Sequence, residues 1–114
     1  MARKLLLLAL ALGACSKGPE SDLQCIGDAR SLAAEWALVN EQAAQGKLTP
    51  AYVASMHQWI RQQIQTDLGA ITQPNAPYAA EIGELLKQPD DAAPASLRSR
   101  SDELKKIEDS LESA

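Results

Sequence analysis

The sequence is short of the residues from which most catalytic and metal sites are built. Its 114 residues include one histidine, two cysteines, two tryptophans, two tyrosines and no phenylalanine. No zinc-type cysteine pair, glycine-rich phosphate loop, nucleophile elbow or HExxH pattern occurs, although each of these chemistries requires its residues at set spacings. We therefore predict that the protein is not an enzyme and holds no metal or other cofactor.

Basic residues are also few. Lys and Arg together number 11 against 15 Asp and Glu, and the formal net charge is −4. Proteins that bind nucleic acid neutralise phosphates with Lys and Arg side chains, and anionic membrane surfaces attract the same residues. The charge balance therefore excludes nucleic acid from the expected partners.

A long apolar run is missing as well. The longest one, residues 5–14, has ten residues, whereas a helix needs roughly 20 to cross the hydrocarbon core of a membrane. Arg3 and Lys4 precede it, and this arrangement is typical of a secretory signal peptide, whose apolar region is about 7–15 residues long.

The end of the apolar run, Leu12-Gly13-Ala14-Cys15, resembles the lipobox of bacterial lipoproteins. The resemblance implies that residues 1–14 are cleaved, with Leu12, Gly13 and Ala14 as the cleavage box. It implies that Cys15 becomes the first residue and carries lipid, including palmitate-type acyl chains. The expected location is the cell envelope, facing the periplasm, and Ser16 favours the outer over the inner membrane. An ordinary signal peptide with an incidental cysteine is the alternative.

Large aliphatic side chains are scarce in the remainder of the chain. Ile, Leu and Val together account for 18 of the 100 residues from position 15 onward, and alanine is abundant instead. Because a domain of this size buries only a modest share of its surface, we expect a thin core. A partner or a second copy would then complete it.

The apolar residues recur at spacings of three or four rather than in alternation, which predicts an all-α fold. Helices over about 22–45 and 50–72 are joined by a short link and should form an αα-hairpin. A short helix over about 78–87 and an amphipathic helix over about 95–113 follow. The expected units are a tether (15–20), a small helical domain (21–88), a linker (89–94) and a C-terminal helix (95–114).

Local signals support the hairpin boundaries. Ser21 and Gln24 have the spacing of a capping box. Gly46 is the expected residue just after the first helix. Thr49 followed by Pro50 is a typical start for the second helix, with the threonine as its N-cap.

Four residues of the two hairpin helices carry further predictions. Counted outward from a turn near Lys47, Trp36 and Trp59 lie nearly level, so we expect them to pack together as the main apolar anchor of the hairpin. His57, the only histidine, is predicted to lie on the helix surface. Cys25 is predicted to be buried, with an intermolecular disulfide as the alternative.

The last helix has a narrow apolar seam on a charged rod. Leu97, Leu104 and Leu111 are seven residues apart, and Ile107 lies between the last two. With little else to pack on, these four residues are the predicted partner contact. The expected charge pairs at a spacing of four are Arg98–Asp102, Asp102–Lys106 and Lys105–Asp109.

Three functions fit these features. The first is a lipid-anchored helical envelope protein that acts as an interaction or adapter module for an envelope protein. The second is a self-associating structural lipoprotein, although the chain ends Glu112-Ser113-Ala114 and lacks the C-terminal lysine with which the major envelope lipoprotein joins the cell wall. The third is a small-ligand binder or inhibitor with a pocket between the hairpin and the third helix.

Overall fold

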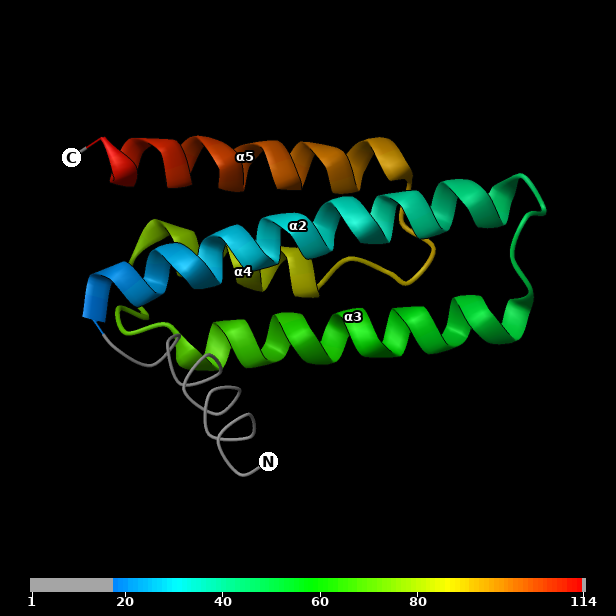
Figure 1. Ribbon diagram of the computed structural model, residues 1–114, viewed down its shortest axis with the longest axis horizontal. Coiled ribbons are helices and arrows are strands. Elements are labelled where there is room, and N and C mark those ends of the chain that lie inside the picture. Colours follow the sequence, from blue (N-terminus) through cyan, green and yellow to red (C-terminus); the bar gives the residue numbers. More distant parts are fainter. Residues whose placement is uncertain (1–17, 114) are drawn as a thin grey trace, which may run out of the picture.

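The computed structural model describes residues 18–113 and shows four helices with no strand in that part of the chain (Figure 1). The predicted signal peptide, the lipobox and Cys15 lie outside the described residues. The all-α prediction is confirmed, with each helix within a few residues of its expected bounds. The helices are α2 (Gly18–Ala44), α3 (Pro50–Ala70), α4 (Pro77–Leu86) and α5 (Pro94–Glu112).

The turn between α2 and α3 follows the chemistry that the sequence indicates. Gly46 has φ +70°, a conformation that glycine adopts without the steric cost of a Cβ atom. Its N–H donates to Ala43 O at 3.0 Å, and the N–H of Lys47 donates to Gln42 O at 3.0 Å, which together form a Schellman motif. Thr49 Oγ1 then caps α3 by accepting from the Tyr52 N–H at 3.2 Å.

The start of α2 differs from the prediction. The helix begins at Gly18, so residues 18–20 belong to it rather than to a tether, and Ser21 lies inside it rather than at its N-cap. The predicted capping box is therefore wrong. Ser21 and the following residue, Asp22, are buried, so the first described turns of the helix are packed against the rest of the domain.

Helix α2 is the centre of the molecule. Helices α3 and α5 pack on opposite flanks of it and do not contact each other, and α4 packs against both of them and against α2 (Figure 1). None of the helices in residues 18–113 is both long and apolar enough to span a bilayer.

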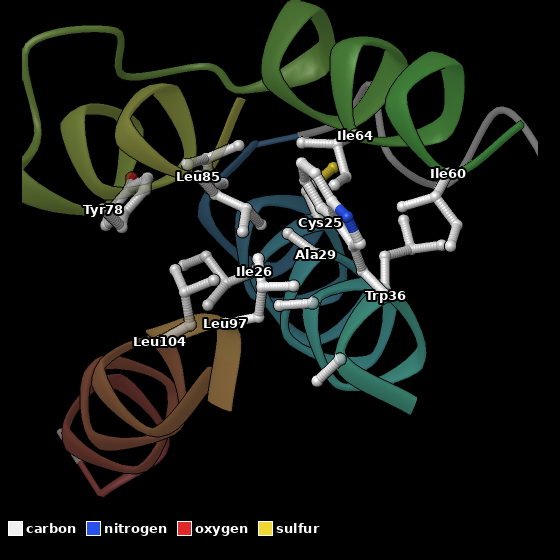
Figure 2. Close-up of a cluster of buried hydrophobic side chains, with 14 of the residues drawn as sticks. Cys25, Ile26, Ala29, Trp36, Ile60, Ile64, Tyr78, Leu85, Leu97 and Leu104 are labelled. Atoms are coloured by element: carbon white, nitrogen blue, oxygen red, sulfur yellow. The ribbon is translucent and has the colours of Figure 1, made fainter. Parts of the chain in front are cut away.

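The core forms where these helices meet on α2. Figure 2 shows Leu97 and Leu104 of α5 directed toward Ile26 of α2, and all three side chains are fully buried. The prediction that residues 95–114 stand apart from a 21–88 domain is therefore wrong. The apolar seam of α5 packs on α2, which is rich in alanine. The small alanine side chains let the two helices approach closely.

The predicted tryptophan pair is wrong. Trp36 is fully buried, but Trp59 is 46% exposed. Residue 59 lies at the right height along α3, yet one position before Ile60 turns its side chain by about 100° away from the buried face. The ring neighbour of Trp36 is instead His57, with 6.4 Å between the ring centroids.

Ion pairs add to the packing of α5. Lys105 and Asp109 pair at 2.9 Å as expected. Neither predicted pair of Asp102 forms, because Arg98 pairs with Glu41 and Lys106 pairs with Glu103. Such surface pairs each contribute little to stability, typically below about 1 kcal/mol. The pairs that join α5 to other helices are Arg30–Glu108 (2.8 Å), Arg98–Glu41 (3.1 Å) and Arg100–Glu81 (2.9 Å).

Candidate functional site

A polar cluster lies at the end of the molecule where α2 turns into α3. It consists of Trp36 and Asn40 on α2 and His57 and Arg61 on α3. Each pair is four residues apart, so both of its members lie on the same side of their helix. The hairpin brings the two pairs face to face beside the segment 87–93, which leads into α5.

The two α2 side chains hold this segment through its backbone carbonyls. Trp36 Nε1 donates to Asp90 O at 2.9 Å. The amide group of Asn40 donates to Asp90 O at 2.9 Å and to Ala92 O at 2.8 Å. A segment that composition marks as a linker is therefore fixed to the hairpin by three hydrogen bonds.

Arg61 holds the same segment from the other helix. Its guanidinium donates to Leu86 O at 2.8 Å and to Gln88 O, and it pairs with Asp90 Oδ1 at 2.5 Å. The same group lies over Trp36, 4.8 Å from the ring centroid, which is a cation–π contact. The N–H groups at the edge of the planar guanidinium therefore donate the hydrogen bonds, and its face contacts the Trp36 ring.

His57 is buried, with 9% of its surface exposed, so its predicted surface position is wrong. Its Nε2 lies 2.7 Å from Asn40 Oδ1. Since the Asn40 amide nitrogen donates to two carbonyls, this oxygen must accept, and Nε2 must carry the proton. In the neutral ring Nδ1 is then the acceptor, available to a group that approaches from outside the cluster.

Two cavities adjoin His57. One has a volume of about 560 Å³ and reaches Arg61 and Asp90, and the other has about 350 Å³ and reaches Asn40 and Asp91. Both are otherwise lined mainly by small apolar residues. Their shared lining residues are Ala43, Val53 and His57.

The polar groups of this cluster serve the fold. Each donor of Arg61, Asn40 and Trp36 described above is engaged by the chain itself, and His57 has no nucleophile beside it. Within residues 18–113, no three His, Cys, Asp or Glu side chains come together as a metal site. The absence of enzymatic activity and of a cofactor remains a prediction.

A second polar cluster ties the opposite end of α2 to the α3–α4 turn. Asp22 accepts from the N–H and Oγ1 of Thr72 at 2.9 and 2.8 Å and from the Tyr78 hydroxyl at 2.7 Å. Burial opposes ionisation of Asp22, but hydrogen bonds from Tyr78 and Thr72 outweigh it and hold its pKa below the ordinary value. Burial and the Asp22 carboxylate raise the pKa of Tyr78 to about 12.

Asp67 of α3 is the buried polar residue with the poorest environment. It is 5% exposed, and its Oδ2 is the one buried side-chain oxygen or nitrogen without a hydrogen-bond partner in the described part of the chain. Burial, followed by a hydrogen bond and the like charge from Asp28 of α2, raises the pKa of Asp67 to about 9. Asp67 is therefore protonated at neutral pH in the folded protein.

The outward side of α3 carries two exposed aromatic residues. Tyr52 is 50% exposed and Trp59 is 46% exposed. They are seven residues apart, which is close to two turns, so they lie on one face of the helix. Met56, between them, is half-buried.

The predicted partner contacts on α5 do not form one surface. Leu97 and Leu104 are fully buried in the core, Ile107 is half-buried, and Leu111 is 39% exposed. The seam has α2 to pack on, so the first two residues are unavailable to a partner. Leu111 alone is well exposed. The cleavage box Leu12, Gly13, Ala14 and the lipidation residue Cys15 lie outside the described residues.

Sequence reasoning missed the cluster around His57. The sequence does contain a signal for it, namely polar residues beside the apolar stripes. His57 and Arg61 lie on either side of Ile60 along α3, and Asn40 directly follows Val39 on α2. No family model, no curated protein and no solved structure matches the chain. The assignment of a function therefore depends on the physical features of the chain itself.

Proposed function

We propose that the protein is a lipid-anchored envelope protein whose helical domain is an interaction module for another envelope protein. The lipobox resemblance at Leu12–Cys15 supports the anchor and a periplasm-facing location, with the outer membrane preferred because Ser16 follows the cysteine. The domain supplies a binding surface in place of a catalytic centre. This surface is the outward side of α3, not the predicted seam of α5.

The observation that carries the proposal is the absence of charge on the exposed side of α3. In a chain with 23% charged residues, the basic and acidic residues of this helix (His57, Arg61 and Asp67) all lie in the buried or half-buried part. The exposed positions are Pro50, Ala51, Tyr52, Ala54, Ser55, Gln58, Trp59, Gln62, Gln65, Thr66 and Gly69.

Such a surface has the composition of the centre of a protein interface. Interface centres are depleted in charged residues and enriched in Tyr, Trp and Met. Tyr and Trp are also the residues whose truncation most often costs more than about 1 kcal/mol of binding energy. By contrast, the exposed side of α5 is dense in Lys, Arg, Asp and Glu. The expected partner therefore presents an uncharged, partly apolar surface to α3.

The test is crosslinking in living cells with a tag after Ala114, followed by mass spectrometry, on the double variant Tyr52→Ala, Trp59→Ala. Leu38→Ala is the matched control, because Leu38 is 49% exposed on α2. We expect the double variant to lose its dominant crosslinked partner, with affinity at least about tenfold lower, while its melting temperature and the control remain unchanged.

Retention of the same partner by the double variant would contradict the proposal. If the only crosslinked species is a second copy of this chain, lost in the same variant, then the protein is the self-associating structural lipoprotein of the second hypothesis. Both results require that the variant is present at the wild-type level, which immunoblotting against the tag measures.

The cavities beside His57 favour one other function, the binding of a small molecule. Their mainly apolar lining and the free acceptor of His57 would suit an amphipathic ligand with one hydrogen-bond donor. The Trp59→Phe variant leaves Trp36 as the single tryptophan, and this ring contacts Arg61 at the cavity edge. Emission from this variant that changes on addition of envelope extract, and does not change when Val53→Phe is added to fill the cavity, would support this function.

A further inference from the structure

An apolar groove lies between the first turn of α4 and the last turns of α5. Its volume is about 440 Å³, which is within the range of small-ligand sites. Carbon atoms dominate its walls, and the exposed part of Leu111 belongs to it. The lining residues are Gln73, Ala76, Pro77, Tyr78, Lys106, Ile107, Ser110 and Leu111.

The groove lies at the end of the molecule where residues 1–17 join the domain. Tyr78, which lines it, donates a hydrogen bond to Asp22 at 2.7 Å. Asp22 is four residues after Gly18, a distance of about 6 Å along the helix. Figure 1 shows the start of α2 and the end of α5 at the same end of the bundle.

The position of Cys15 puts its acyl chains within reach of this groove. Only the peptide units between Cys15 and Gly18 separate them from the domain, and three residues extend over about 10 Å at most. The His57 cavities lie at the other end of α2, which is about 40 Å long. Unlike the His57 cavities, the α4–α5 groove therefore combines an apolar lining with proximity to the anchor.

We propose that one acyl chain of lipidated Cys15 docks in the groove between α4 and α5. The inference rests on the lipid anchor of the proposed function and deepens it. The groove covers one chain, and the remaining chains of the anchor stay in the membrane. Docking holds the domain with this end toward the bilayer and directs the α2–α3 turn, with the His57 cavities, away from it.

The side chains of the groove fit this occupant. Ile107 is half-buried against the core, whereas Leu111 is exposed to water without an occupant. An acyl chain would cover both side chains without requiring any hydrogen bond. Lys106, at the edge, pairs with Glu103 at 3.3 Å and has an exposed amine, so the groove presents a charge only at its rim.

Hydrogen exchange of residues 105–112 tests the proposal. The lipidated protein is compared, in vesicles of phosphatidylethanolamine and phosphatidylglycerol, with the Cys15→Ser protein held on vesicles by an N-terminal histidine tag and a nickel-chelating lipid. We expect exchange in the lipidated protein to be slower by about tenfold or more. Ser110→Trp, which fills the groove, should abolish this difference, whereas the control Leu38→Trp should preserve it.

Three results would overturn the inference. The first is exchange in the lipidated protein that is as fast as in the tagged protein without vesicles, once incorporation of labelled palmitate has shown that Cys15 is lipidated. The second is equal protection of the tagged Cys15→Ser protein, which would make the bilayer itself the occupant. The third is protection that persists in Ser110→Trp. Absence of labelled palmitate from the wild-type protein would instead refute the anchor, and with it the proposed function.

Discussion

Buried polar side chains in this protein differ sharply in how well they are paired. Asn40 uses its amide nitrogen and its oxygen, and Asp22 accepts three hydrogen bonds. Asp67, by contrast, keeps one oxygen without a partner. An unpaired buried polar atom costs about 1–3 kcal/mol, so we expect Asp67 to destabilise the fold.

The first prediction concerns the pH dependence caused by Asp67. Its folded pKa of about 9 lies above the ordinary value of about 3.9 for aspartate. Between these values the folded state binds more protons than the unfolded state, so stability falls as the pH rises. Asp67→Asn keeps the shape without the titration. We expect its melting temperature to exceed that of the wild type by a growing margin from about pH 5 to about pH 9.

Thermal unfolding followed by circular dichroism measures this margin. Asp102→Asn is the matched control, because Asp102 is exposed on α5 and undergoes the same chemical change. A margin that stays constant with pH would show that Asp67 is ionised in the folded protein and that Asp28 does not share its proton.

At the scale of elements, α5 shows how an amphipathic pattern can be assigned to the wrong neighbour. Its apolar stripe predicts a helix with one buried face, and that helix forms. The stripe packs on α2 of the same chain, and Trp36, Asn40 and Arg61 hold the segment 87–93, which leads into α5, against the hairpin. Composition does not reveal those hydrogen bonds, and by itself it predicts that α5 is only loosely connected to the hairpin.

The second prediction compares two leucines of α5. Leu104→Ala removes a fully buried side chain, and we expect it to lower the free energy of unfolding by about 2–5 kcal/mol. Leu111→Ala alters a side chain that is 39% exposed, and we expect a change below about 1 kcal/mol. Urea unfolding of both variants provides the measurement. Equal effects would mean that α5 does not pack on α2 in solution.

At the scale of the whole molecule, α2 organises the fold. Both α3 and α5 bury their apolar faces on it, so neither flank can be removed without exposing core residues. The hairpin is therefore not an independent domain, although its local signals are the strongest in the sequence.

The third prediction follows from this dependence. A chain of residues 18–93, which lacks α5, exposes the face of α2 that carries Ile26 (Figure 2). We expect it to lose cooperative unfolding and to show hydrogen-exchange protection lower by about a hundredfold or more in α2. The full domain, residues 18–113, is the control. A cooperative transition of the shorter chain would show that the hairpin folds alone.

The sequence by itself determined the helices, since their signals are local. Gly46, Thr49 and Pro50 act within a few residues of their own position, and apolar spacing reports the period of the helix. It also predicted burial of Cys25, with an intermolecular disulfide as the alternative, and the structure confirms that this residue is buried.

Only the tertiary structure decided which faces meet. Trp59 and Ile60 are successive residues, so their side chains point in directions about 100° apart around the axis of α3. Helical spacing does not show which of the two directions faces Trp36. The buried position of His57 depends on Asn40 of α2, and that of the half-buried Arg61 depends on carbonyls at Leu86 and Gln88, all of them distant in the chain. The destination of the α5 seam likewise depends on α2. Contacts between distant segments set these outcomes, and no local pattern encodes them.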